Sequence, residues 1–219
     1  MTFSLFVKSV SERLSELYGP EECRAIALRL LDDFLGVSGS DYALKLNDVI
    51  PYESEELLNS AVEQMVKGRP LQYVTGFEWF CGYKFVVGEG VLIPRPETEE
   101  LVEWIKECAG DGVKGEQGVS VNNRLKIFDA ACGSGAIGIS LAKAFNGSTV
   151  FACDLSERAM ELSKINAESI LESYDSLREA GVGYKLFKCD LLNEGEVEGY
   201  LPEKELDIVV ESIISLLNI

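Results

Sequence analysis

The residues of this chain whose types and spacing best suit chemistry lie in one short segment, Asp129–Gly138. It reads Asp-Ala-Ala-Cys-Gly-Ser-Gly-Ala-Ile-Gly. Strand-like apolar residues precede the segment and a helical pattern follows it, so it would be a tight turn between a β-strand and a helix. Glycines let the backbone approach a ligand where a Cβ would collide, and the first helical turn offers free amide donors. The segment therefore predicts a cofactor site.

Two acidic residues follow later strand-like segments. Asp154 directly follows the predicted strand Thr149–Cys153. A carboxylate at that place can accept hydrogen bonds from the two ribose hydroxyls of a nucleoside. Asp190 follows the next such segment and could meet an adenine amino group, with Leu191 over the ring. Either acid could instead be only a helix cap. Together with the glycine turn they favour S-adenosylmethionine, and a nicotinamide dinucleotide is the weaker interpretation. The predicted cofactor-binding residues are Asp129, Ala131, Cys132, Gly133, Ser134, Gly135, Asp154, Leu155, Asp190 and Leu191.

The elements that would position this site alternate between strand and helix. We expect strands at 125–129, 149–153, 184–188 and 206–210, with helices at 136–145 and from 157 into the 170s. Such alternation is typical of a parallel sheet with right-handed crossovers, so the predicted fold class is α/β. The acidic residues would then meet at the carboxyl edge of the sheet, where ligands bind in open α/β folds.

The segments before residue 125 have a different character. Residues 1–68 show three amphipathic helical patterns, which predict a small bundle. Aromatic and β-branched runs at 77–80 and 83–87 predict a β-hairpin, and a helix is expected at 97–106 before a surface loop at 109–124. The expected domains are therefore a helical domain at 1–75, a hairpin and linker helix at 76–106, and a cofactor-binding domain at 107–219.

The amino-acid composition argues against several classes of partner and active site. A formal net charge of −17 disfavours nucleic acid as a direct partner. The chain has no histidine, and its six cysteines form no C-x-x-C pair, which argues against a metal site and against a histidine-based triad. We expect reduced cysteines in a cytoplasmic protein, because no signal peptide and no apolar run of membrane-spanning length is present.

A resemblance to a known family covers nearly the whole chain. The order of the cofactor motifs resembles that of class I methyltransferases. Upstream, Arg69–Gly76 (Arg-Pro-Leu-Gln-Tyr-Val-Thr-Gly), Glu78–Phe80 and Val91–Glu99 (Val-Leu-Ile-Pro-Arg-Pro-Glu-Thr-Glu) are similar to the signature of the release factor glutamine methyltransferases, the PrmC/HemK family. Asn166-Ala167 fits the same pattern.

The resemblance implies an activity, a cofactor and a partner. It implies transfer of a methyl group from S-adenosylmethionine to the side-chain amide nitrogen of the glutamine in the Gly-Gly-Gln motif of peptide chain release factors. It also implies a Rossmann-like methyltransferase sheet and an N-terminal helical domain that recognises the release factor. We expect the acidic chain to suit a basic partner surface.

One segment departs from the family pattern. The family carries Asn-Pro-Pro-Tyr after its fourth strand, whereas Leu206–Ser215 reads Leu-Asp-Ile-Val-Val-Glu-Ser-Ile-Ile-Ser, with Ser212 at the Asn position. We therefore assign no catalytic residue, and we expect a C-terminally truncated chain with an incomplete sheet and poor activity. Two alternatives stay open: a non-catalytic remnant that binds cofactor or release factor, and a methyltransferase that acts on another substrate.

Overall fold

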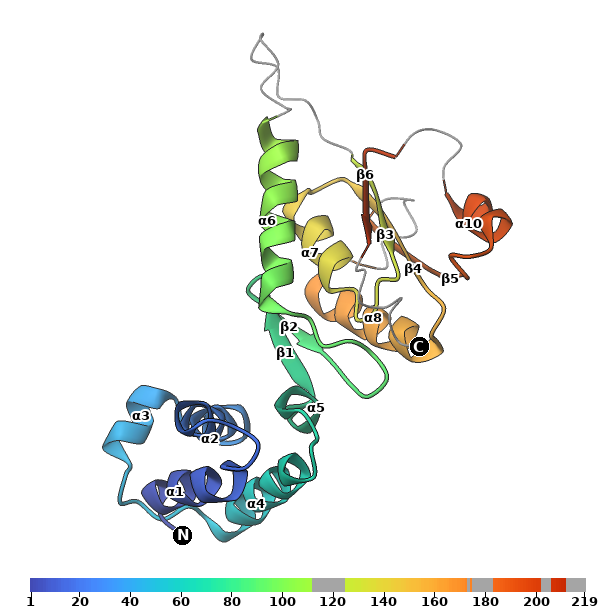
Figure 1. Ribbon diagram of the computed structural model, residues 1–219. Helices are drawn as coiled ribbons and strands as arrows, with labels where there is room; N and C mark the ends of the chain where they lie inside the picture. Colours follow the sequence, from blue (N-terminus) through green and yellow to red (C-terminus); the bar gives the residue numbers. More distant parts are fainter. Residues whose placement is uncertain (112–124, 173, 175–182, 202–205, 212–219) are drawn as a thin grey trace. The chain divides into compact units, whose positions relative to one another are not determined.

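The computed structural model describes residues 1–111, 125–172, 174, 183–201 and 206–211 (Figure 1). These residues form two compact units, Met1–Gly76 and Phe77–Ile219. The hairpin and the helix that follows it belong to the second unit. In the described part of the chain, no helix is long and apolar enough to cross a membrane.

The N-terminal unit is a helical bundle, as the sequence predicts. Thr2 caps the first helix by accepting a hydrogen bond from the Leu5 amide, and Gly36 ends the second in the left-handed conformation that glycine tolerates. Two short helices, α3 and α5, were not predicted, because five or six residues are too few to show a helical period. The helices are α1 (Phe3–Leu14), α2 (Pro20–Leu35), α3 (Gly39–Leu44), α4 (Tyr52–Val66) and α5 (Leu71–Thr75).

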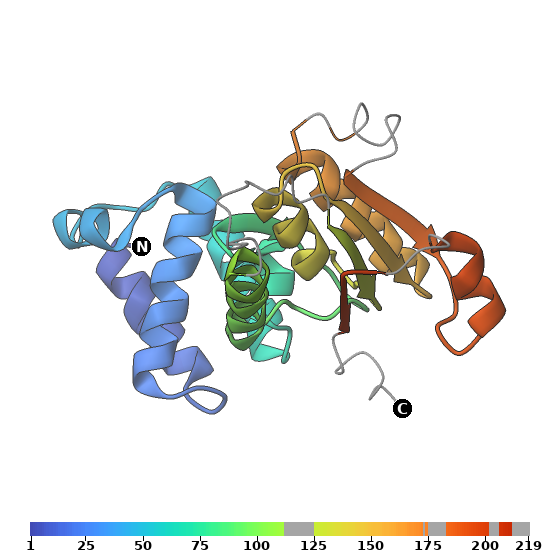
Figure 2. The same ribbon diagram turned by 90° about the horizontal axis from the view of Figure 1, so that it is seen from above.

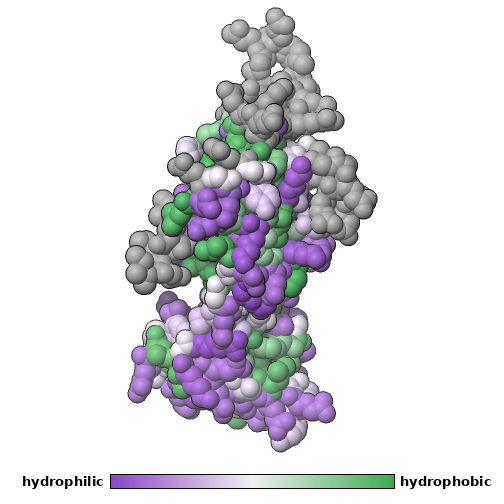
Figure 3. Space-filling model, turned by 90° about the vertical axis from the view of Figure 1, so that its right-hand side faces the viewer, coloured by the Kyte–Doolittle hydropathy of each residue, from purple (hydrophilic) through white to green (hydrophobic). Residues whose placement is uncertain are grey.

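The surface of this unit is polar and carries excess negative charge. Residues 1–76 contain twelve acidic and seven basic side chains. In the view of Figure 3 the unit is largely hydrophilic, with smaller apolar areas between the polar ones. Leu44 at the end of α3, Val49 in the following loop and Tyr52 at the start of α4 are exposed by 86%, 71% and 73%.

The second unit opens with the predicted hairpin. Strands β1 (Phe77–Phe80) and β2 (Tyr83–Val86) pair antiparallel, with Phe77 opposite Val86. Helix α6 (Pro96–Asp111) begins at a proline, whose missing amide hydrogen costs nothing at a first helical position. The helix is longer than predicted, because it continues through 107–111, where Gly110 suggested a loop. The rest of the predicted loop lies outside the described residues.

A four-stranded parallel sheet forms the centre of the second unit, which confirms the predicted α/β class. Its order is β5-β4-β3-β6. The strands are β3 (Lys126–Ala130), β4 (Thr149–Asp154), β5 (Gly183–Lys188) and β6 (Ile208–Glu211), and the helices are α7 (Ala136–Ala144), α8 (Glu157–Ile170) and α10 (Glu194–Tyr200). Of these helices, only α10 was not predicted.

Both faces of the central strands are buried, which explains their continuous apolar runs. Ile127 and Val150 point into a core shared with α6, α7 and α8. Their neighbours Phe128 and Phe151 point to the opposite face, where Val197 of α10 packs against them. Figures 1 and 2 show α7 and α10 on opposite sides of the sheet. Among the described strands β6 lies at an edge, where Val209 is 64% exposed.

One buried side chain joins the hairpin to the parallel sheet. Asn166 of α8 accepts a hydrogen bond from the Val86 amide at 2.7 Å and donates to the Val86 carbonyl at 3.0 Å. The same amide nitrogen donates to the Ser134 carbonyl at 2.9 Å. Because Asn166 is fully buried, no water can replace these bonds. This side chain therefore fixes strand β2 against the turn that precedes α7.

We predict that Asn166→Ala destabilises the second unit by about 2–4 kcal/mol, because it leaves two partly buried backbone groups of Val86 and the buried Ser134 carbonyl without this partner. Both tryptophans, Trp79 and Trp104, lie in this unit, so urea unfolding followed by tryptophan fluorescence reports on it alone. Asn193→Ala is the matched control, because Asn193 is exposed and bonds only at the surface. An equal midpoint for wild type and Asn166→Ala would contradict the prediction.

Candidate functional site

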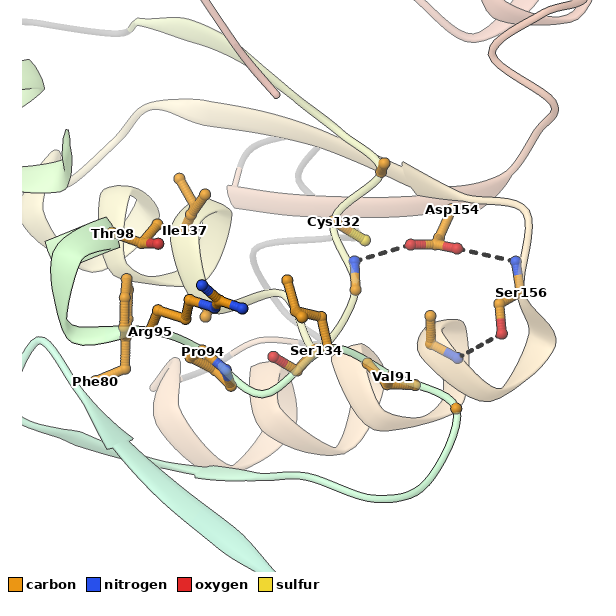
Figure 4. A pocket seen from close by; sticks show the side chains of 16 residues that line it. Phe80, Val91, Pro94, Arg95, Thr98, Cys132, Ser134, Ile137, Asp154 and Ser156 are labelled. Carbon is orange, nitrogen blue, oxygen red and sulfur yellow. Dashed lines mark hydrogen bonds between the residues drawn. The ribbon is translucent and has the colours of Figure 1, made fainter. Parts of the chain in front are cut away.

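A pocket lies at the carboxyl ends of β3 and β4, where an open parallel sheet places its ligands. Its volume is about 190 Å³. One wall is the glycine turn and the first turn of α7, and the opposite wall is the segment between the hairpin and α6 (Figure 4). The lining residues are Phe80, Gly90, Val91, Leu92, Pro94, Arg95, Thr98, Ala131, Cys132, Gly133, Ser134, Ala136, Ile137, Asp154, Ser156 and Ala159.

The glycine turn is tightly constrained. Ala131, Gly133 and Gly135 all have positive φ, of 54°, 56° and 80°. A Cβ on Gly135 would lie 2.6 Å from the Ser163 hydroxyl oxygen, and one on Gly138 would lie 2.6 Å from Asp129 Oδ2. Glycine at these two positions is thus required by the protein's own packing. Gly133 differs, since a Cβ there would meet only Val91, at 3.7 Å, and its backbone lines the pocket.

Asp154 is held by the turn that it faces. Its Oδ2 accepts a hydrogen bond from the Gly133 amide at 2.9 Å, and its Oδ1 accepts one from the Ser156 amide at 2.9 Å (Figure 4). The helix cap is a different residue, because Ser156 caps α8 by accepting from the Ala159 amide at 3.3 Å. Each Asp154 oxygen keeps a lone pair for a further donor. The structure therefore presents an oriented carboxylate at one end of the pocket.

Asp129 lies beneath the turn and outside the pocket lining. It is 1% exposed, and its Oδ2 accepts a hydrogen bond from the Gly138 amide at 2.8 Å. Burial raises the pKa of this carboxyl group to about 7, and the nearby charge of Asp154 acts in the same direction. Asp129 thus supports the start of α7 and is partly protonated near neutral pH.

The structure brings together half of the predicted cofactor-binding residues. Ala131, Cys132, Gly133, Ser134 and Asp154 line the pocket. Cys132 forms an inert wall there, because burial raises the pKa of its thiol well above the usual value.

The other predicted residues lie outside the pocket lining. Gly135, like Asp129, serves the packing of the turn. Leu155 is 60% exposed, Asp190 Oδ1 accepts from the Leu192 amide at 2.9 Å, and Leu191 packs in the core near α10. Their contact with a cofactor stays a prediction. Ser212 lies outside the described residues.

A larger cavity, of about 590 Å³, lies between α6 and β6. Trp104, Ile105 and Val209 contribute to a lining that is almost entirely apolar. It lacks the few convergent polar groups that orient a small ligand. The smaller pocket, which holds the Asp154 carboxylate, is therefore the better candidate for a ligand site.

Comparison with known proteins agrees with this architecture. Residues 6–76 match the family model of the PrmC N-terminal domain, and residues 117–181 match that of the methyltransferase small domain. The release factor glutamine methyltransferase of Bacillus subtilis is 32% identical over 206 residues, which cover 94% of this chain and 64% of that protein. The corresponding protein of Bacteroides thetaiotaomicron is 33% identical over 161 residues, 74% of this chain and 54% of that protein.

The chain is a relative of the release factor glutamine methyltransferases. It spans about half to two thirds of the length of the curated relatives that it matches. Solved structures are less similar. A human methyltransferase 10 domain containing protein is 17% identical and covers 60% of this chain and 53% of its own, with a TM-score of 0.44.

Sequence reasoning missed the wall opposite the glycine turn. Phe80, Arg95 and Thr98 line the pocket, although the sequence analysis assigned Glu78–Phe80 and Val91–Glu99 only to a family signature. Gly133, Gly135 and Gly138 fit the G-x-G-x-x-G pattern of dinucleotide sites, yet two of the three serve internal packing. Their spacing alone therefore identifies no ligand.

We predict that the stability of the second unit depends on pH through Asp129. Its folded-state pKa, about 7, lies above the ordinary value of 3.8. The stabilising contribution of the protonated form is therefore complete below about pH 4 and is lost as the pH rises through about 7. Each unit of pKa shift corresponds to about 1.4 kcal/mol, so the loss amounts to a few kcal/mol.

Asp129→Asn removes this titration. Relative to wild type, the variant is expected to gain stability between pH 5 and pH 8, because only wild type must then bury an ionised carboxylate. Urea unfolding at the two pH values, followed by tryptophan fluorescence, measures the difference. A gap between wild type and variant that is the same at both values would contradict the prediction.

Proposed function

We propose that this chain binds S-adenosylmethionine in the pocket beside Asp154 and acts as a methyltransferase on the glutamine side chain of peptide chain release factors. The observation that carries the proposal is the Asp154 carboxylate, fixed by the Gly133 and Ser156 amides at the carboxyl edge of a parallel sheet. The names of the relatives support a methyl donor over a dinucleotide.

The lining residues fit part of such a cofactor. Asp154 has free lone pairs for ribose hydroxyls, and the turn from Ala131 to Ser134 offers a backbone wall without large side chains. A volume of about 190 Å³ is below the roughly 300 Å³ at which whole-ligand pockets begin. We therefore assign the ribose and methionine parts to this pocket, and the adenine to the neighbouring edge with Leu155, Asp190 and Leu191.

The cofactor supplies an electrophilic methyl group, and the protein must aim a poor nucleophile at it. An amide nitrogen is weakly nucleophilic because its lone pair is delocalised into the carbonyl group. Catalysis would therefore consist mainly of positioning the glutamine and excluding water. Phe80, Val91 and Ile137 supply the apolar part of the pocket lining that excludes water.

A second candidate function is cofactor binding without methyl transfer. It is favoured by the residues after β6, where Ser212-Ile213-Ile214 stands in place of the Asn-Pro-Pro that the family resemblance leads us to expect. An Asn side chain and a proline carbonyl would accept the hydrogens of the glutamine amide. Serine at that position cannot reproduce the reach of an asparagine side chain.

The partner and compartment follow from the N-terminal unit and the cysteines. We assign release factor recognition to the helical unit, on the strength of its match to the PrmC N-terminal domain and its exposed Leu44, Val49 and Tyr52. All six cysteines are free thiols. Free thiols are typical of the reducing cytoplasm, where we place the protein.

We predict that Asp154→Asn weakens S-adenosylmethionine binding by about 1.5–3 kcal/mol, roughly a 10- to 150-fold rise in Kd, because a charged acceptor becomes neutral. Isothermal titration calorimetry measures the change. Glu157→Gln is the control, since Glu157 is a nearby exposed acid that pairs with Lys188 outside the pocket. An unchanged Kd for Asp154→Asn would remove Asp154 from the site.

Transfer is tested separately from binding. Radiolabelled S-adenosylmethionine and release factor are incubated with wild type and with a variant in which Ser212-Ile-Ile-Ser215 becomes Asn-Pro-Pro-Tyr. If the absence of Asn-Pro-Pro-Tyr limits methyl transfer, the variant should transfer the label at least about 100-fold faster, since misplacing the reacting groups lowers a reaction rate by about that factor. Equal, substantial transfer by both chains would contradict the binding-only candidate. Tight cofactor binding without transfer by either chain would contradict the proposed reaction.

A further inference from the structure

The apolar groove between α6 and β6 has exposed apolar walls. On the α6 side its lining residues recur at helical spacing, so they form one stripe of the helix: Leu101, Trp104, Ile105, Cys108 and Ala109. Trp104 is 63% exposed, and Val209 on the β6 side is 64% exposed. The one charged lining residue, Asp207, uses its Oδ2 to accept a hydrogen bond from the Lys126 amide at 2.8 Å. Exposed apolar side chains gathered around a groove mark an interaction surface.

The groove is bounded by an open strand edge. Strand β6 pairs with β3 along one edge, and none of the described strands pairs with its other edge. Figure 2 shows β6 as the strand of the sheet nearest to α6. An open edge presents unpaired N–H and C=O groups, which can pair with another extended segment. The groove therefore suits an extended apolar segment that brings main-chain hydrogen-bonding groups of its own.

The residues that follow β6 have this chemistry. Residues 212–219, which lie outside the described residues, read Ser-Ile-Ile-Ser-Leu-Leu-Asn-Ile and contain five apolar side chains and no charged one. They begin where β6 ends, so the chain itself keeps them at a high effective concentration beside the groove. Eight extended residues span roughly 26 Å, and the four residues of β6 span roughly 13 Å. The segment is therefore long enough to reverse direction and run along β6.

We propose that residues 212–219 fold back and bind in this groove, with Leu216, Leu217 and Ile219 supplying the apolar side chains that cover Trp104 and the open edge of β6. This inference does not depend on the proposed function. A second copy of the chain is a weaker occupant, because two chains that each carry a net charge of −17 repel one another.

The position of the groove gives the direction of the bound segment. Its lining includes Leu125 and Asp207, which precede β3 and β6 along the chain. The pocket beside Asp154 lies at the other, carboxyl ends of the parallel strands. The bound segment therefore runs antiparallel to β6 and away from that pocket. It covers a strand edge that could otherwise pair with other chains.

Disulfide trapping tests the contact, because Cys108 is exposed and lines the groove. Leu216→Cys, Leu217→Cys and Ile219→Cys are made one at a time in the full chain and oxidised with copper phenanthroline. At least one variant should form a disulfide to Cys108 within the same chain, identified by mass spectrometry of tryptic peptides. Adding Cys108→Ser should abolish that product. Leu192→Cys is the matched control and should give none, because Leu192 is 86% exposed after β5, at the other edge of the sheet.

Tryptophan fluorescence distinguishes a bound segment from one that only collides with the groove. Trp79→Phe leaves Trp104 as the only tryptophan of the chain. In that background, Leu216→Asp together with Leu217→Asp should shift the emission to longer wavelength and increase quenching by acrylamide. The reason is that a charged segment leaves an apolar groove and uncovers the indole ring. Leu192→Asp is the control, and it should change neither quantity.

Three results would overturn the proposal. The first is that none of the three introduced cysteines forms a disulfide to Cys108. The second is a disulfide that joins two chains and increases with protein concentration, which would make a second copy the occupant. The third is quenching of Trp104 that the two aspartates leave unchanged. None of these measurements uses a cofactor or a release factor, so failure of the proposed function would leave them valid.

Discussion

The pocket depends on one buried amide, the side chain of Asn166. It uses its carbonyl oxygen and both amide hydrogens on the backbones of Val86 and Ser134. These two backbones belong to opposite walls: the hairpin leads into the segment with Arg95, and Ser134 lies in the glycine turn. A side chain that is both donor and acceptor is needed here, because one strand residue presents an amide and a carbonyl to it at once. No aliphatic residue of similar size could hold both walls.

Close packing also determines which residues can form the turn beneath the pocket. Gly135 and Gly138 are glycines because Ser163, Tyr184 and Asp129 occupy the places where their Cβ atoms would be. The turn therefore packs closely against its neighbours at Gly135 and Gly138, whereas Gly133 and Ser134 line the pocket. The consequence is a buried carboxyl group, Asp129, whose pKa is raised to about 7. Close packing of this motif thus ties its stability to pH near neutrality.

The sequence predicted the features that are encoded locally. The β-strands, the longer helices and the glycine turn follow from periodicity and turn residues within short windows, and all are present in the described residues. Helices α3, α5 and α10 were missed because they have only five to seven residues. The wall formed by Phe80 and Arg95 was missed for a different reason. It faces the glycine turn because of contacts with α8, which comes much later in the chain: the Asn166 hydrogen bonds and the packing of Val91 against Ala159 and Leu162.

In the proposed function, the residues that hold a methyl donor and the residues that aim an acceptor come from separate parts of this chain. The pocket proposed for the ribose and methionine parts of the donor is formed by described residues around β3, β4, α7 and the segment before α6. The acceptor side is expected after β6, where the family pattern departs at Ser212. Binding that is equally strong in the ground state and the transition state lowers no barrier. Under the proposed function, affinity for the donor therefore reports only on the first half of the site, and we expect the residues after Glu211 to determine whether the bound donor transfers its methyl group.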